Sequence, residues 1–78
     1  MELTLSQLGR DETAFVAGYK PGNQAYRSKL LSLGLTKGVA VRMKKTAPLG
    51  DPVEIEVRGY SLSLRKAEAD ILVLRRGA

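Results

Sequence analysis

Three short segments between residues 39 and 64 alternate apolar and polar side chains with a period of two. Such alternation is typical of antiparallel strands that bury one face and expose the other. Arg58 and Gly59 separate the last two segments, which predicts a tight two-residue hairpin with Gly59 at positive φ. The apolar positions are Val39, Val41 and Met43, then Val53, Ile55 and Val57, then Tyr60, Leu62 and Leu64.

Two further segments have the composition of strands. Residues Thr13–Tyr19 are rich in β-forming side chains and end at the turn-forming sequence Lys-Pro-Gly-Asn. Residues 70–76, Asp-Ile-Leu-Val-Leu-Arg-Arg, follow a short turn at residues 66–69 and form a closing strand. The sequence therefore predicts one long strand before the meander and one strand after it.

A single helix is predicted between the first strand and the meander. Asn23 is a favourable N-cap for a helix that runs from about Gln24 to Leu33. Within it Tyr26, Leu30 and Leu33 follow the i, i+4, i+7 spacing of one apolar stripe, and Leu31 lies beside that stripe.

The end of this helix is specified by a glycine. Gly34 stands at the C′ position, where a left-handed residue terminates a helix, and Leu35 follows at C″. In such a motif the apolar C″ side chain folds back on the last turn, so we expect Leu35 to contact Leu30. Gly34 and Gly59 are therefore the two glycines to which we assign structural roles.

These elements predict a mainly β fold. The 78 residues contain no repeat, linker or low-complexity tract, so we interpret residues 1–78 as one domain. So few strands make a flat sheet of little stability, and we expect the meander to curl until its ends pair and its edges disappear. The expected architecture is a small, partly open SH3-like β-barrel with one inserted α-helix.

The composition argues against catalysis and against a metal site. The chain has neither Cys nor His, which removes the usual nucleophile–base pairs, the thiolate zinc sites and the commonest metal ligand. No phosphate-binding glycine loop is present in the sequence. We therefore expect no enzymatic activity, no catalytic residue, no resident metal and no cofactor.

One cluster of acidic residues could either bind a cation or form ion pairs. Asp51, Glu54 and Glu56 are close in sequence, and the two glutamates share the outward face of one predicted strand. Hard cations require six or more oxygen ligands, which two spaced glutamates do not supply. Cross-strand ion pairing is the favoured interpretation. The basic partners available for it are Arg42, Lys44 and Arg65.

The net charge of +5 favours acidic partners in general. The cations are nevertheless scattered, and the longest basic runs are pairs of residues. The sequence has no apolar run long enough to span a membrane and no signal-peptide pattern at its start. We expect a cytoplasmic protein whose basic residues mainly keep it soluble.

The loop at residues 48–52, Pro-Leu-Gly-Asp-Pro, is mostly explained by turn chemistry. Pro48 and Pro52 fix φ, Gly50 and Asp51 form turns, and the next strand must begin after Pro52. Turn chemistry does not explain Leu49, an apolar side chain at the loop tip. Either Leu49 covers an open end of the barrel or a partner covers Leu49.

Three segments in combination resemble one family: AYRSKLLSLGL, APLGDPVEIEVRG and LSLRKAEADILV. Together they resemble the ferrous-iron transport protein A (FeoA) family over about residues 13–74, and residues 25–35 look like its enterobacterial-type members. The first dozen residues carry no comparable signature. The resemblance implies an SH3-like fold, no known enzymatic activity, and a partner, the cytoplasmic GTPase region of the ferrous-iron transporter FeoB.

The resemblance also implies candidate partner-binding residues. They lie in the loop and on the helix. Leu30 could equally belong to the core. The resemblance also implies that the protein reaches the membrane through its partner only. These candidates are Tyr26, Arg27, Leu30, Leu31, Pro48, Leu49, Gly50, Asp51 and Pro52.

The sequence suggests two other functions less strongly. A small basic barrel that binds single-stranded nucleic acid is the alternative, but such proteins stack bases on exposed aromatic rings and this chain has only four aromatic residues. We therefore expect no nucleic-acid partner. A metal-sensing module ranks lower, because it rests only on the three carboxylates named above. The same fold occurs in iron-dependent repressors, but no helix-turn-helix precedes it here, which argues against a whole repressor.

Overall fold

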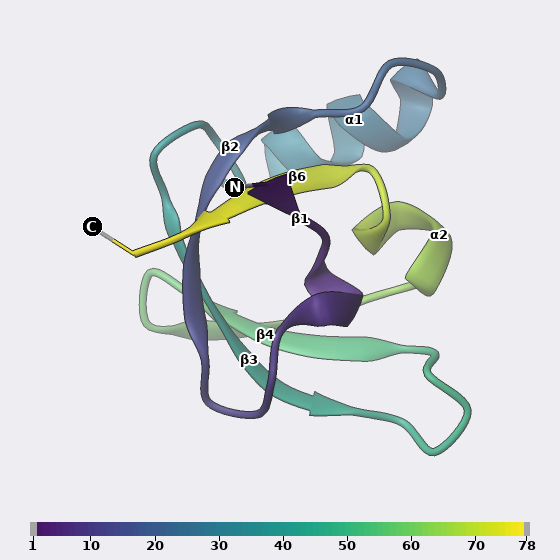
Figure 1. Ribbon diagram of the computed structural model, residues 1–78. Helices are drawn as coiled ribbons and strands as arrows, with labels where there is room; N and C mark the ends of the chain where they lie inside the picture. Colours follow the sequence, from purple (N-terminus) through teal and green to yellow (C-terminus); the bar gives the residue numbers. More distant parts are fainter. Residues whose placement is uncertain (1, 78) are drawn as a thin grey trace.

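A six-stranded antiparallel sheet forms the body of the protein. The computed structural model describes residues 2–77, and Figure 1 shows their arrangement. The strands lie in the order β1-β6-β2-β3-β4-β5. The elements in chain order are β1 (Glu2–Leu3), the 3-10 helix η1 (Leu5–Gln7), β2 (Thr13–Tyr19), α1 (Gln24–Ser32), β3 (Ala40–Thr46), β4 (Val53–Val57), β5 (Tyr60–Leu64), α2 (Lys66–Ala69) and β6 (Leu72–Arg76).

The sheet curls into a partly open barrel, which confirms the expected fold class. The expectation that its edges disappear is wrong, because β1 and β5 each have a single neighbour among the strands of residues 2–77. β1 pairs only Glu2 and Leu3 with β6 before the chain turns into η1, so it cannot extend far enough to close the sheet. Two edges therefore remain.

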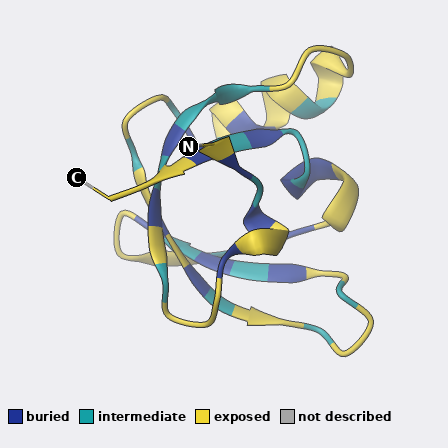
Figure 2. Ribbon diagram, in the orientation of Figure 1, coloured by how far each residue is buried: buried dark blue, intermediate teal, exposed yellow. Residues whose placement is uncertain are grey.

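The period-two alternation correctly predicts the buried face. In β4 the three apolar side chains Val53, Ile55 and Val57 are buried, and the two glutamates between them are partly exposed. In β3, Val41 and Met43 are buried in the same way. Figure 2 shows buried positions alternating with more exposed ones along these strands. The buried side chains form one continuous core for the domain.

The hairpin between β4 and β5 turns within two residues, as predicted. Val57 pairs with Tyr60, and the two residues between them both have positive φ, 51° at Arg58 and 85° at Gly59. Two positive values in succession are the geometry of a type I′ turn, whose twist matches that of the strands it joins. The left-handed conformation of Arg58 was not predicted from the sequence.

Helix α1 begins and ends almost where its capping residues predict. The Asn23 side chain accepts a hydrogen bond of 3.0 Å from the Tyr26 N–H. The helix ends at Ser32 with Leu33 as its C-cap, one residue earlier than expected. Gly34 has a φ of 91° and its N–H donates to the Leu31 carbonyl at 3.0 Å. The motif therefore has the predicted left-handed glycine.

Leu35 completes this helix end as predicted. Its N–H donates to the Leu30 carbonyl at 3.1 Å, which is the second hydrogen bond of a Schellman motif. Both leucine side chains are fully buried in the core. The helix stop thus joins α1 to the barrel through apolar packing as well as hydrogen bonding.

Two tyrosine hydroxyls hold the same helix end. Tyr60, the first residue of β5, donates to the Leu33 carbonyl at 2.6 Å. Tyr19, the last residue of β2, donates to the Leu35 carbonyl. The Tyr60 side chain was expected to face inward, yet 43% of the residue is exposed because its hydroxyl reaches the helix instead of the core. Two strands therefore donate to the Leu33 carbonyl, which the helix cannot satisfy, and to the Leu35 carbonyl just beyond it.

The first dozen residues contribute to the core, which the sequence did not indicate. Leu3, Leu5 and Leu8 are all buried. Glu12 accepts hydrogen bonds from the Arg76 guanidinium and from the Gly9 N–H, so the segment is tied to the last strand. The pKa of the Glu12 carboxyl is lowered, chiefly by the hydrogen bond from Arg76.

Residues 66–69, predicted as a turn, form the single helical turn α2. Neither α1 nor α2 is long and apolar enough to cross a bilayer, and the same holds for every helix within residues 2–77.

The helix stop yields a test with a matched control. Gly34 and Gly38 have nearly equal φ values of 91° and 89°, but a Cβ at Gly34 would lie 3.1 Å from the Tyr60 hydroxyl, while a Cβ at Gly38 meets no atom within 4 Å. Gly38→Ala should lower the free energy of unfolding by about 1 kcal/mol through backbone strain alone. Gly34→Ala should cost about 1 kcal/mol more, because the Tyr60 hydrogen bond is disturbed as well.

Urea unfolding of the two variants measures this difference. Equal losses would show that the Tyr60 contact does not stabilise the helix end.

Candidate functional site

The predicted partner-binding residues of α1 divide into buried and exposed positions. Leu30 is fully buried, so it is a core residue and its prediction as a docking residue is wrong. Leu31, beside it in sequence, is 40% exposed. Tyr26 is half-buried and Arg27 is exposed. Only Leu31 of these two adjacent leucines reaches the surface, because Leu30 fits into the core between the helix and the sheet.

The Arg27 side chain lies against a residue of β2. Its guanidinium carbon is 5.3 Å from the centre of the Tyr19 ring, which is within the range of a cation–π contact. Burial raises the pKa of the Tyr19 phenol, although Arg27 opposes this effect. Tyr19 therefore remains a protonated donor to the helix end, and its ring supports the arginine at the surface.

The loop between β3 and β4 is a compact turn with an exposed tip. The Gly50 N–H donates to the Ala47 carbonyl at 2.8 Å, and Gly50 has a φ of 82°. β4 begins directly after Pro52, as predicted. Leu49 is 94% exposed, so it does not cover the barrel. The alternative in which Leu49 covers an open end of the barrel is therefore wrong, and contact with a partner stays a prediction.

Asp51 has a structural role within this loop. Its carboxylate Oδ1 accepts a hydrogen bond of 3.0 Å from the Lys66 N–H at the start of α2. A carboxylate at this position satisfies a helix N–H that has no partner inside the helix. Asp51 therefore fixes the loop to α2, while Pro48 and Leu49 project from it as exposed residues.

The second attachment of α2 is an ion pair with α1. Lys29 Nζ lies 2.7 Å from Glu68 Oε2, and Glu68 Oε1 accepts a 3.1 Å hydrogen bond from the Arg65 N–H. Within residues 2–77, Glu68 is the one charged residue that is buried. The hydrogen bond from Lys29 is the main reason that the pKa of the Glu68 carboxyl is lowered, against the opposing effect of burial.

The helix and the loop do not form one continuous patch. Figure 1 shows α1 and the loop at separate ends of the molecule, with α2 between them. α2 contacts both, through Glu68 to Lys29 and through the Lys66 N–H to Asp51. Sequence analysis missed Glu68. The available signal was its place three residues after Arg65, where a glutamate often accepts from the backbone N–H of the N-cap.

The outward glutamates of β4 follow the cross-strand prediction in part. Glu56 Oε1 lies 3.6 Å from an Arg42 guanidinium nitrogen, as expected. Glu54 forms no ion pair within the described residues. A register shift in β3 makes Lys44 the extra residue, so that Lys45 stands opposite Glu54. This bulge removes Lys44 from the position that simple alternation assigned to it.

A metal ion finds no set of ligands here. No group of three or more acidic residues in the described part of the chain is placed to hold one, and His and Cys are absent from the sequence. Asp51 is also occupied by its hydrogen bond to α2.

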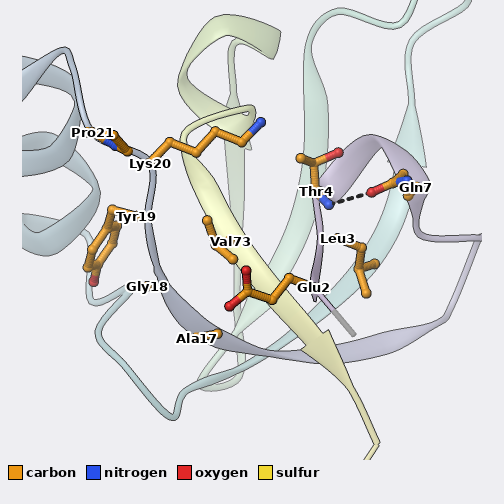
Figure 3. Close-up of a pocket in the computed structure, with 10 residues that line it drawn as sticks. All are labelled: Glu2, Leu3, Thr4, Gln7, Ala17, Gly18, Tyr19, Lys20, Pro21 and Val73. Atoms are coloured by element: carbon orange, nitrogen blue, oxygen red, sulfur yellow. Dashed lines mark hydrogen bonds between the residues drawn. The ribbon is translucent and has the colours of Figure 1, made fainter.

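Figure 3 shows the residues that line a hollow between the N-terminal segment and the end of β2. The volume of this hollow is about 540 Å³. Its lining includes the Glu2 carboxylate, the Lys20 ammonium and the apolar Val73. One acid and one base do not make a catalytic or metal-binding constellation. None of the predicted partner-binding residues lines this hollow.

Comparison with known proteins identifies the family. The model of the FeoA domain matches residues 3–76. The chain belongs to the FeoA family. This result confirms the family resemblance, while the enterobacterial-type assignment stays a prediction. The match includes the N-terminal segment from Leu3, for which the sequence had shown no signature.

Three relatives illustrate the similarity. A fusion protein of Fe(2+) transport protein A and Fe(2+) transporter FeoB from Porphyromonas gingivalis is 30% identical over 67 residues, which are 86% of this chain and 8% of the relative's length. The solution structure of a FeoA-like protein from Clostridium acetobutylicum has a TM-score of 0.85 and 32% identity, covering 95% of this chain and 85% of that one.

The third relative is FeoA of Stenotrophomonas maltophilia, an SH3 domain protein whose crystal structure contains zinc. Its TM-score is 0.79 at 33% identity, over 92% of this chain and 88% of that one. The comparison confirms the SH3-like fold class.

The ion pair between α1 and α2 gives a pH prediction. A carboxyl whose pKa is lowered by folding contributes stability above its unfolded pKa of about 4.3, and this contribution is lost as the pH falls through the folded pKa. Glu68→Gln should therefore lower the free energy of unfolding by about 1–2 kcal/mol at pH 7. It should cost much less near pH 2, where the wild-type carboxyl is protonated too.

Urea unfolding at both pH values tests this. Glu12→Gln serves as a control, because Glu12 is the other glutamate whose carboxyl pKa is lowered in the folded protein. Lys29→Met leaves the Glu68 carboxylate buried beside an apolar side chain, so its deficit relative to wild type should shrink as the pH falls. Losses that do not change with pH would mean that the ion pair contributes no electrostatic stability.

Proposed function

We propose that this protein is a non-enzymatic accessory protein of bacterial ferrous-iron uptake, which acts in the cytoplasm by binding the GTPase region of the transporter FeoB. One observation carries the proposal. In the Porphyromonas gingivalis relative, a protein similar to this chain is fused to FeoB, so the two are held together permanently. Fusion keeps the two parts at a high effective concentration, so that they can bind each other within one chain. The same two parts are expected to bind each other where they occur as separate chains.

The exposed residues of the candidate site fit a protein partner. Leu49 presents almost its whole side chain to solvent at a loop tip, and Leu31 is the exposed leucine of α1. Apolar anchors surrounded by polar residues are typical of interface centres. Arg27, held over Tyr19, supplies a positioned cation on the same helix. The proposed surface therefore has two parts, the outer side of α1 and the loop, joined by α2.

The aromatic residues do not support the nucleic-acid alternative. Tyr19 and Tyr60 use their hydroxyls to hold the end of α1, and Tyr26 and Phe15 are half-buried. Base stacking requires rings that are open to solvent on a shared surface. Several of the cations also have acidic partners, as Arg42 does with Asp11 and Glu56.

Leu49→Ser tests the proposal directly. Since Leu49 is exposed, the substitution should change the stability of the fold by less than about 0.5 kcal/mol. Binding to the isolated cytoplasmic domain of FeoB from the same organism should weaken about thirtyfold, the scale expected for an apolar anchor worth about 2 kcal/mol. Titration calorimetry with a GTP analogue and with GDP measures the affinity in both nucleotide states.

Lys45→Gln is the matched control, because Lys45 is an exposed cation close to the same loop. It should leave FeoB binding unchanged. A protein that bound single-stranded DNA would respond in the opposite way. Lys45→Gln would lower its affinity for DNA, and that affinity would fall steeply as the salt concentration rises. Micromolar binding to single-stranded DNA without binding to the FeoB domain would contradict the proposal.

A further inference from the structure

The outer edge of β5 has backbone groups that no other strand uses. β5 pairs with β4 from Tyr60 to Leu64 without a register shift. A two-residue turn makes Val57 and Tyr60 a hydrogen-bonded pair. Hydrogen-bonded pairs alternate along an antiparallel ladder, so the backbone N–H and C=O groups of Leu62 and Leu64 also point toward β4. The N–H and C=O groups of Ser61 and Ser63 consequently point away from β4, along the free edge.

This edge lacks the features that usually protect an edge strand. Proteins guard such strands with Lys, Pro, bulges or very short length. The sequence of β5, Tyr-Ser-Leu-Ser-Leu, contains neither charge nor proline, and both serines are exposed. The other edge is different, because β1 has only two residues and leads at once into η1. β5 is therefore the edge that can accept another strand.

Two arginines mark the ends of this edge. Arg58 lies just before β5 and Arg65 just after it, both are exposed, and neither forms an ion pair within residues 2–77. No acidic residue occurs between positions 57 and 67. An added strand would therefore pass from one unpaired cation to the other. Carboxylates at the two ends of that strand, about seven positions apart, would meet both arginines.

We propose that the β5 edge binds an extended, acidic-ended segment of a partner protein, which adds to the sheet as a seventh strand. Main-chain hydrogen bonds to Ser61 and Ser63 supply the pairing, and Arg58 and Arg65 select the charge of the segment. A second copy of this chain fits poorly, because antiparallel pairing about Leu62 sets Arg58 of each copy against Lys66 of the other. The inference is independent of the proposed function.

The probe is a blocked eight-residue peptide with alternating threonine and valine between a glutamate at each end. Its matched control has lysine at both ends. The glutamate peptide should bind the full chain at least tenfold more tightly than the lysine peptide, and it should slow the hydrogen exchange of the Ser61 and Ser63 amides. Binding should disappear when the six central residues of the peptide are N-methylated, because the donors of the added strand are then lost.

Variants locate the two components separately. Arg58→Gln with Arg65→Gln should reduce the tenfold preference to about one while the chain stays folded. Ser61→Pro should abolish peptide binding, because the N–H that it removes points to the free edge and is not used by β4. Ser61→Ala keeps that N–H and should bind normally.

Three results would overturn the proposal: unchanged exchange of both serine amides at millimolar peptide, equal affinity for the two charged peptides, or full binding of the N-methylated peptide. Sedimentation of the free chain as a dimer that Ser61→Pro converts to a monomer would assign the edge to a second copy instead.

Discussion

The end of helix α1 is the point at which the two sides of the open sheet meet. Tyr19 belongs to β2 and Tyr60 to β5, and two strands, β3 and β4, lie between them in the sheet. Both hydroxyls nevertheless donate to carbonyls at the same Schellman turn, those of Leu35 and Leu33. This is possible only if the sheet curls, so the helix end fixes the curvature that the hydrogen bonding of the strands leaves open.

The positions of the proposed binding surfaces follow from this arrangement. Since α1 is held at its C-terminal end by the tyrosines, its other attachment, Lys29 to Glu68, sets where α2 lies. α2 in turn orders the 47–52 loop through the Asp51 hydrogen bond. The exposed leucines of the helix and the loop are thus parts of one connected framework, although they lie apart. The barrel stays open beyond the tyrosines, which leaves the β5 edge free for a further strand.

Local signals in the sequence predicted most of the fold, because capping and alternation act over a few residues. Asn23, Gly34 and Gly59 each occupy the predicted position. What the sequence could not show depends on distant partners. The ion pair of Glu68 depends on Lys29, which lies 39 residues away in sequence. The bulge at Lys44 and the exposure of Leu49 likewise depend on how the strands pair. Leu30 and Leu31 look equivalent in the sequence, and only the packing of α1 on the sheet determines that Leu30 is the buried one.

The most direct test of this account is a double-mutant cycle with Tyr19→Phe and Tyr60→Phe, followed by urea unfolding at pH 7. Each single variant removes one hydroxyl and little volume, and should lower the free energy of unfolding by about 1 kcal/mol. If both hydroxyls hold one helix end, the two losses should be coupled by at least about 0.5 kcal/mol. Losses that add without coupling, or single variants as stable as wild type, would show that the helix end does not join β2 to β5.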